Sequence, residues 1–151
     1  MTQLSIGDKA PDFSGIDQNN ESVSLDQYKG KKVVLYFYPK DNTPGCTAEA
    51  CDLRDNYERF LSQGYVVIGV SADSVASHKK FSEKFELPFP IISDPERKIL
   101  EAYNAYGEKK LYGKVSMGIL RKTYIIDEHG MITDIIEKVK TKEHSKQILG
   151  E

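Results

Sequence analysis

Two short runs of β-branched and aromatic residues, separated by a helical pattern, constrain the fold of this chain more than any other feature. Residues 32–38 (KVVLYFY) and 65–70 (YVVIGV) are apolar without alternation, which is typical of strands buried on both faces. Between them, apolar residues recur at spacings of three and four from Cys46 to Leu61, and Gly64 follows as a helix stop. The pattern predicts a strand–helix–strand unit inside a sheet that helices cover.

The remaining segments extend this unit into a complete domain. Asn19-Asn20 indicates a small N-terminal hairpin between residues 13–16 and 23–25, and Glu128-His129-Gly130 indicates a second hairpin between residues 122–127 and 131–137. Further elements are a short strand at 90–93 and helices at 75–85, 96–103 and 141–149. This order predicts an α/β fold, a three-layer sandwich with a central mixed β-sheet and an N-terminal hairpin, and it resembles the thioredoxin fold. Without a linker or repeat, residues 1–151 are expected to form a single domain.

The composition excludes several classes of protein. A net charge of −2 gives no electrostatic reason to expect nucleic acid or an anionic membrane as a partner. No apolar run approaches the ~18 residues needed to span a bilayer, and residues 1–13 lack the pattern of a signal peptide. We therefore expect a cytoplasmic protein. We also expect a monomer, with a weak dimer as the alternative, although neither follows from the composition. In a reducing compartment its two cysteines do not indicate a structural disulfide framework.

The loop after the first strand places a cysteine at the start of a helix. The loop contains the turn-favouring residues Pro39, Asn42, Pro44 and Gly45. Thr43 is a suitable N-cap, and a proline such as Pro44 suits the first helical position. Cys46 then lies in the first turn, where free backbone N–H groups and the positive end of the helix dipole stabilise an anion. The thiolate is the reactive form of cysteine, so this position favours chemistry at Cys46.

A helix end alone does not make a fast thiol catalyst. A more stable thiolate is more abundant but intrinsically less nucleophilic, and the two effects largely cancel. Attack by the thiolate also needs fixed donors for the charge that develops on the leaving group. The Thr43 hydroxyl, backbone N–H groups near Cys46 and a cation are the candidates.

The run Thr43-Pro44-Gly45-Cys46-Thr47, followed by Glu49-Ala50-Cys51, resembles the active-site motif of peroxiredoxins, and specifically their bacterioferritin comigratory protein, or Q-type, subfamily. The resemblance extends over essentially the full length, through residues 7–13, 67–71 and 118–127. It implies a peroxidatic cysteine at Cys46, a resolving cysteine at Cys51, and peroxide-binding roles for Thr43 and Arg121. Pro39 and Pro44 would shape the pocket. Lys122 departs from the resemblance, which leads us to expect a small hydroxyl or polar residue there.

The resemblance also implies a reaction. The protein would be a thioredoxin-dependent peroxiredoxin, an atypical two-cysteine peroxidase that reduces hydrogen peroxide and organic hydroperoxides to water or alcohol. A Cys46 sulfenic acid would condense with Cys51 to an intramolecular disulfide, which thioredoxin or a similar dithiol reductant would reduce. No cofactor and no metal would be required, because the sulfur carries the two electrons.

Each candidate residue also has a plainer interpretation. Either cysteine could be an inert thiol, although the helical neighbours of Cys51 are polar, which is unusual for a buried thiol. Arg121 could be a surface charge and Thr43 only an N-cap. Glu49, one turn into the helix, is expected on the surface, and Lys40-Asp41-Asn42 in a solvated loop. The three histidines show no partner, and with one cysteine pair they lack the four-ligand spacing of a zinc site.

Two other functions compete with the peroxidase. A disulfide oxidoreductase on the same fold would favour a Cys-x-x-Cys motif, whereas four residues separate Cys46 from Cys51. A binding or chaperone-like domain would have two inert thiols. Helix geometry adds a constraint, since residues 46 and 51 on one regular helix have Cα atoms roughly 8.6 Å apart, beyond the ~7 Å limit of a disulfide. Either the first turns of the helix, from about Pro44 to Arg54, unwind when the disulfide forms, or these residues are not helical in the reduced protein; we expect unwinding.

Overall fold

Strands β3 (Lys32–Phe37) and β4 (Tyr65–Ser71) form the centre of a seven-stranded sheet in the computed structural model, which describes residues 3–150. The two strands are parallel, in register from Lys32 opposite Tyr65 to Phe37 opposite Val70. Residues 33–37 and 66–71 are buried, as the unbroken apolar runs predict for strands covered on both faces.

The other strands make the sheet mixed. Its order is β2-β1-β5-β4-β3-β8-β9, with β5 parallel to β4 and with β8 antiparallel to β3. The predicted hairpins at both ends of the chain are confirmed as the antiparallel pairs β1–β2 and β8–β9. The five strands are β1 (Ser14–Asp17), β2 (Ser22–Ser24), β5 (Ile91–Ser93), β8 (Lys122–Ile126) and β9 (Ile132–Ile136).

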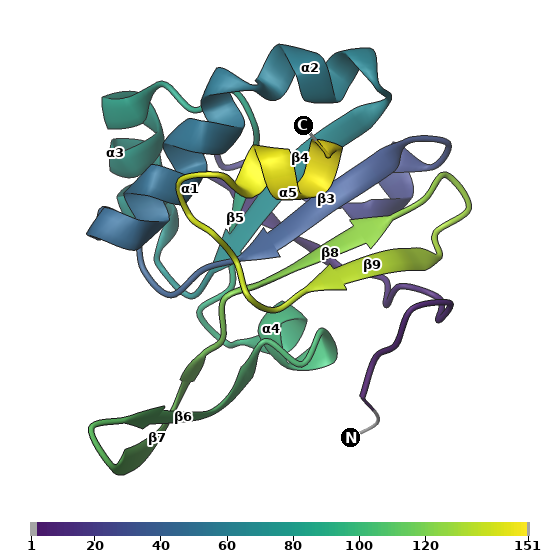
Figure 1. Ribbon diagram of the computed structural model, residues 1–151. Helices are drawn as coiled ribbons and strands as arrows, with labels where there is room; N and C mark the ends of the chain where they lie inside the picture. The colour runs from purple at the N-terminus through teal and green to yellow at the C-terminus, as the bar shows by residue number, and fades with distance from the viewer. Residues whose placement is uncertain (1–2, 151) are drawn as a thin grey trace.

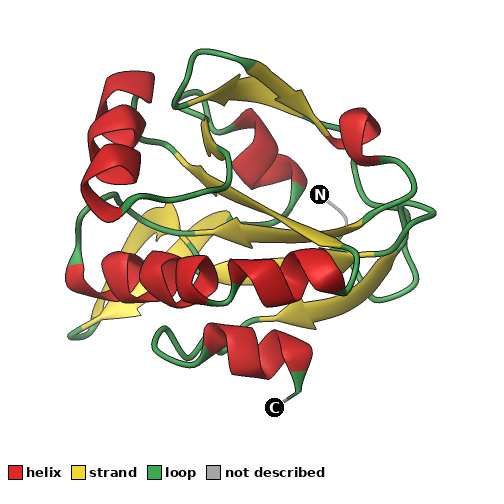
Figure 2. Cartoon of the chain, turned by 90° about the horizontal axis from the view of Figure 1, so that it is seen from above, coloured by secondary structure: helices red, strands yellow, loops and turns green. Residues whose placement is uncertain are grey.

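Helices cover the sheet on both faces and complete the predicted three-layer sandwich (Figures 1 and 2). One face carries α1 (Pro44–Asp55), α2 (Tyr57–Ser62), α3 (Val75–Phe85) and α5 (His144–Leu149), and the other carries α4 (Lys98–Ala102) and the 3₁₀ helix η1 (Leu25–Tyr28). Successive residues of β3 point to opposite faces, so Val34 and Tyr36 join the α1 side of the core and Leu35 joins the α4 side.

The predicted helix from Cys46 to Leu61 is wrong in one respect, because it is interrupted at Asn56. This residue ends α1 and precedes α2 with φ −109° and ψ 10°. Its side-chain amide donates to the carbonyl of Asp52 at 2.9 Å, a local bond of the kind that competes with regular helix. The two pieces still follow one another along the same face of the sheet (Figure 2).

A third hairpin, formed by residues 106–119, has no counterpart in the sequence prediction. Strands β6 (Tyr106–Leu111) and β7 (Lys114–Ile119) pair antiparallel and project from the body as a separate two-stranded sheet (Figure 1). Much of this hairpin lies in solvent, so it carries little of the apolar alternation that predicts a strand. Within residues 3–150, no helix is both long enough and apolar enough to cross a membrane.

Candidate active site

The end of β3 and the start of α1 place Cys46 in the core. Pro44 is the first helical residue, Thr43 is the N-cap with extended φ and ψ, and Thr47 N–H donates to the Thr43 carbonyl at 2.8 Å. Cys46 is only 1% exposed and packs in the cluster between α1 and the sheet. The predicted position of this cysteine in the first turn of a helix is confirmed.

Thr43 uses its hydroxyl differently from an ordinary N-cap. The hydroxyl makes no capping hydrogen bond to the helix and instead donates to the carbonyl oxygen of Lys40 at 2.9 Å. Its proton is therefore engaged inside the loop, while its oxygen keeps lone pairs. In this arrangement the oxygen is free to accept a further hydrogen bond.

Arg121 reaches Cys46 because β8 begins where β3 ends. The antiparallel register places Lys122 opposite Phe37, so Arg121 lies beside the exit of β3. Its guanidinium Nη2 donates to Cys46 Sγ at 3.2 Å. Glycine at position 45 allows this close approach, because a Cβ atom there would lie only 3.2 Å from Arg121 Nη2. A fixed cation thus touches the sulfur, as a thiolate site requires.

Glu49 is not the surface residue that the sequence predicted. Its side chain is fully buried, and Oε1 accepts from Arg121 Nη1 at 2.7 Å. Burial raises the pKa of this carboxyl to about 7, although the Arg121 guanidinium opposes the shift. The spacing of three from Cys46 places both residues on one face of α1, and that spacing was the signal available in the sequence.

His144 of α5 lies on the far side of Glu49. Its Nδ1 faces Gln147 Oε1 at 2.8 Å, and that oxygen also accepts from Lys140 N–H, so Nδ1 carries the proton. Nε2 then accepts from the Thr123 hydroxyl at 2.7 Å. Burial lowers the pKa of His144, which agrees with a neutral ring. Within the described residues Glu49 Oε2 has no hydrogen-bond partner, and His144 Nε2 lies 3.6 Å from it.

Asp41 also contradicts the sequence prediction, because it is buried rather than solvated. Its carboxylate accepts from the Tyr38 hydroxyl at 2.6 Å and from the Ser77 hydroxyl at 2.8 Å, and lies 2.7 Å from His78 Nδ1. The other ring nitrogen of His78 lies 3.0 Å from the carbonyl of Ile92. The pair ties the loop before Thr43 to α3.

The same cluster includes three side chains with metal-ligand atoms. Atoms of Asp41, Asp73 and His78 lie within 4.8 Å of one another. Asp73 Oδ2, however, already accepts from Asp41 N–H at 2.8 Å and from the Ser71 hydroxyl at 2.7 Å. This hydrogen-bond pattern fits a loop anchor better than a cation site.

Cys51 lies on α1 five residues beyond Cys46 and is partly exposed. Both thiols are free. On a regular helix their Cα atoms are roughly 8.6 Å apart, so the folded helix cannot carry a bridge between them. The structure thus brings Arg121 to Cys46, places Thr43 at the N-cap of the same helix, and holds Cys51 at a distance.

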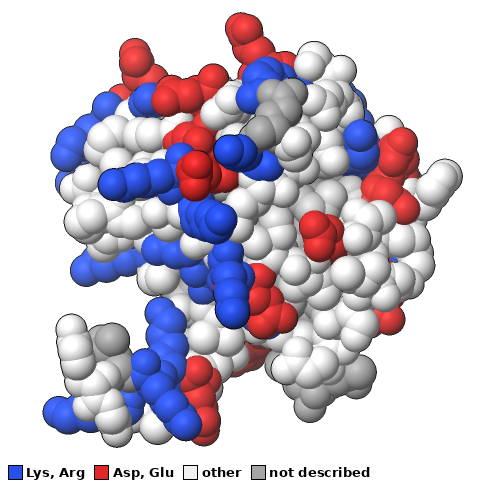
Figure 3. All heavy atoms as spheres, in the orientation of Figure 1, with Lys and Arg blue, Asp and Glu red and all other residues white. Residues whose placement is uncertain are grey.

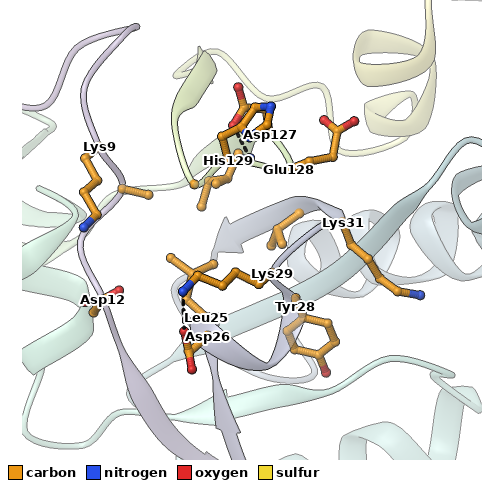
Figure 4. A pocket seen from close by; sticks show the side chains of 14 residues that line it. Lys9, Asp12, Leu25, Asp26, Tyr28, Lys29, Lys31, Asp127, Glu128 and His129 are labelled. Carbon is orange, nitrogen blue, oxygen red and sulfur yellow. Dashed lines mark hydrogen bonds and ion pairs between the residues drawn. The ribbon is translucent and has the colours of Figure 1, made fainter.

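A cavity at the opposite end of the sheet offers no comparable chemistry. It measures about 370 Å³ and lies between the start of β3, the end of β8 and η1 (Figure 4). Its labelled side chains mix both charges, with Lys29 paired to Asp26 at 3.5 Å. No cysteine lines it, and acidic and basic side chains are mixed along its wall. The candidate active site is therefore the one at Cys46.

Comparison with known proteins decides the family. The model of the AhpC/TSA family matches residues 6–135. The chain belongs to the AhpC/TSA family. Peroxiredoxin Bcp of Bacillus subtilis is 49% identical over 146 residues, 97% of this chain and 93% of that protein. Peroxiredoxin Bcp of Escherichia coli is 40% identical over 150 residues, 99% of this chain and 96% of the relative.

Solved structures of Q-type peroxiredoxins share the fold. The bacterioferritin comigratory protein of Xanthomonas campestris, studied for alkyl peroxide reduction, superposes with a TM-score of 0.86 at 35% identity, covering 91% of this chain and 88% of that one. A Xylella fastidiosa peroxiredoxin Q gives 0.91 at 31% identity, covering 99% and 96%. The predicted thioredoxin fold and subfamily are confirmed, and the protein is a thiol-dependent peroxidase that acts on a peroxide substrate with a thioredoxin-type reductant.

Proposed function

We propose that Cys46 is the peroxidatic cysteine and Cys51 the resolving cysteine of this peroxidase, with Thr43 and Arg121 holding the peroxide. The observation that supports this assignment best is the 3.2 Å contact between Arg121 Nη2 and Cys46 Sγ at the N-terminus of α1. The guanidinium and the helix end both favour the thiolate over the thiol.

In the first half-reaction the Cys46 thiolate attacks the terminal oxygen of the hydroperoxide. A sulfur–oxygen bond forms while the O–O bond breaks, and the leaving oxygen departs with the bonding electrons and takes up a proton as water or alcohol. Arg121 stabilises the charge on the reacting oxygens, and the Thr43 oxygen accepts the O–H of the bound hydroperoxide. The sulfur is oxidised by two electrons to a sulfenic acid.

In the second half-reaction Cys51 attacks the Cys46 sulfenic acid and releases water. The resulting disulfide is reduced by an external dithiol, which becomes oxidised in turn. Thioredoxin is the reductant that we propose for this chain. We also propose that the protein works in the cytoplasm as a monomer or weak dimer, since its modest net charge and two thiols suit a reducing, soluble setting. No step needs a metal or an organic cofactor.

Coupled turnover with thioredoxin, thioredoxin reductase and NADPH tests the assignment. Wild type should consume hydrogen peroxide continuously, and Cys46→Ser should consume none. Cys51→Ser should react once and stop as a sulfenic acid or a mixed disulfide. Multiple turnovers by Cys46→Ser would overturn the role of Cys46. Sustained thioredoxin-supported turnover by Cys51→Ser would overturn the role of Cys51 as the sole resolving residue.

A further inference from the structure

Helix α5 brings a buried histidine to the carboxylate that holds Arg121. The helix packs along α1 (Figures 1 and 2), and Ser145 fixes it there. The backbone N–H of Ser145 donates to Asp52 Oδ2 at 2.7 Å, and its hydroxyl donates to the Asp52 carbonyl at 3.2 Å. His144 is then fully buried, and its Nε2 lies 3.6 Å from Oε2 of the equally buried Glu49. None of the roles proposed above uses His144.

The facing atoms of Glu49 and His144, here called the Glu49–His144 pair, lack a proton between them. Nδ1 of the ring donates to Gln147, so Nε2 is an acceptor. Oε2 of an ionised Glu49 is an acceptor too, and within residues 3–150 it has no hydrogen-bond partner. A buried carboxylate oxygen that faces a nitrogen lone pair is costly. One added proton, on either Oε2 or Nε2, removes this cost.

The pKa values of the two residues agree with a proton held between them. Burial raises the pKa of Glu49 to about 7, although Arg121 opposes the shift, and burial lowers the pKa of His144. Two groups this close titrate together, so the proton belongs to the pair rather than to one residue. The Glu49–His144 pair therefore has no net charge below pH about 7 and a single negative charge above it.

The other charged or titratable groups that face the pair come from three elements. Arg121, directly before β8, is permanently protonated. Burial raises the pKa of Tyr36 of β3 well above its usual value, so the phenol stays neutral. On α1, the negative charge of Asp52 raises the pKa of Glu49 and opposes the lowering at His144, and Cys46 lies on the other side of the guanidinium. The charged residues of α5 and its N-cap are exposed, namely Glu143 and Lys146.

The charge of the pair decides how much of the Arg121 charge is left for the sulfur. The guanidinium lies between two anions, because Nη1 donates to Glu49 Oε1 at 2.7 Å and Nη2 donates to Cys46 Sγ at 3.2 Å. An ionised pair competes for this cation, whereas a neutral pair leaves it to the thiolate and the reacting oxygens. The effect is screened less than that of the surface charges in Figure 3, since Glu49 and His144 are buried.

We propose that His144 is a positioning residue for peroxide reduction, which shares one proton with Glu49 and thereby keeps the positive charge of Arg121 directed at Cys46 and the peroxide. The inference rests on the proposed roles of Cys46 and Arg121. His144 touches no reacting atom, and the covalent steps remain those described above. The shared proton comes from water and is not consumed in the reaction.

The test follows the stopped-flow rate constant of the reduced protein with hydrogen peroxide over pH, without thioredoxin. The thiolate fraction varies with pH in every variant, so each profile is compared with that of Glu49→Gln, whose amide cannot ionise. Relative to this reference, the wild-type rate constant should fall about tenfold as pH rises through 7, the effect of one nearby charge. His129→Gln, the same change at an exposed histidine, should show the wild-type fall.

Two changes on α5 should move this fall in opposite directions. His144→Gln places an amide N–H beside Glu49 Oε2 and stabilises the ionised carboxylate, so the fall should shift to lower pH by about one unit. Gln147→Glu places a carboxylate against Nδ1–H and raises the affinity of the ring for a second proton, so the fall should shift to higher pH by about one unit. In the Glu49→Gln background, His144→Gln should leave the pH profile unchanged.

Identical pH profiles of wild type and Glu49→Gln would overturn the inference. So would an unshifted fall in both α5 variants, or shifts of both in the same direction. An effect of His144→Gln that persisted in the Glu49→Gln background would also overturn it, because His144 would then act only through packing. If the reduced wild type failed to react with hydrogen peroxide at every pH, the proposed function would be wrong, and this inference with it.

Discussion

The guanidinium of Arg121 lies 3.2 Å from the sulfur of Cys46, although 75 residues separate the two in the chain. The contact exists because Arg121 precedes the strand that pairs with the end of β3, and β3 delivers the chain to the loop before α1. A second guanidinium nitrogen, Nη1, donates to the carboxylate of buried Glu49 at 2.7 Å, and this bond holds the guanidinium group against the sulfur. The cation is thus oriented before any substrate arrives.

Removing the Arg121 guanidinium should slow the reaction with peroxide. Arg121→Ala is expected to lower the stopped-flow rate constant by roughly 100-fold, the effect of a lost transition-state donor. Arg121→Ala also leaves the Glu49 carboxylate buried without its charged partner. The double variant Arg121→Ala/Glu49→Gln should therefore show the same rate loss but be more stable than Arg121→Ala alone. Arg54→Ala removes a guanidinium that binds exposed Asp55 and the carbonyl of Phe85; it is the control and should keep the wild-type rate. A rate within threefold of wild type for Arg121→Ala would show that Arg121 does not stabilise the transition state.

Disulfide formation should unwind the first turns of α1. Cys46 and Cys51 on one helix are too far apart to be bridged, and helix order is what favours the Cys46 thiolate. Amide exchange of residues 47–54 should be slow in the reduced protein and fast in the oxidised protein. Helix α3, residues 75–85, should exchange equally in both forms. Equal protection of 47–54 in both forms, with the intramolecular disulfide verified by mass, would contradict this mechanism.

Glu49 should make the stability depend on pH. Burial raises its pKa to about 7 from 4.5, so between these values the folded protein binds more protons than the unfolded chain. Stability contributed by the protonated carboxyl is complete below pH 4.5 and is lost as pH rises through 7, by about 3 kcal/mol. Glu49→Gln removes this loss.

Urea denaturation of both proteins at several pH values measures the effect. The free energy of unfolding of wild type relative to Glu49→Gln should decrease from pH 4.5 to 7.5. His144 has a lowered pKa, which makes stability rise with pH, but it is present in both proteins and largely cancels. Parallel pH profiles for the two proteins would show that Glu49 does not titrate in this range.

The buried pair of Asp41 and His78 should stabilise the loop before Thr43. His78→Leu leaves the buried Asp41 carboxyl group without one of its hydrogen-bond partners, which should cost about 1–3 kcal/mol in the free energy of unfolding. Asp41→Asn/His78→Leu should recover part of this loss, because no unpaired charge remains. His129→Leu, a change at an exposed histidine, should leave the urea midpoint unchanged. A midpoint for His78→Leu equal to that of His129→Leu would rule out the anchor.

The elements that sequence predicted well are those whose pattern depends on burial against the sheet. The unbroken apolar runs of β3 and β4 and the Thr43-Pro44 helix start are local signals, and the structure confirms both. The β6–β7 hairpin projects into solvent, so no buried face imposed a periodicity that could be detected.

The partners of Cys46 were harder to predict, because they come from distant parts of the chain. Glu49 has the sequence context of a surface helix residue, and only β8 and α5 packing over that face of α1 bury it. Asp41 likewise looks like a loop residue until α3 brings His78 against it. Arg121 could be named from the family resemblance, but its distance from the sulfur depends on strand register, which composition does not encode.

The most direct test of the account is a peptide map of the reduced protein after addition of one equivalent of hydrogen peroxide. The free thiols are alkylated, the protein is digested, and the state of each cysteine is read by mass spectrometry. We predict that both thiols disappear together and that a single intramolecular Cys46–Cys51 disulfide appears, while Cys51→Ser stops with oxidised Cys46. If both thiols of wild type stayed free to react with the alkylating agent, or if Cys51 were oxidised while Cys46 was not, the account would be wrong.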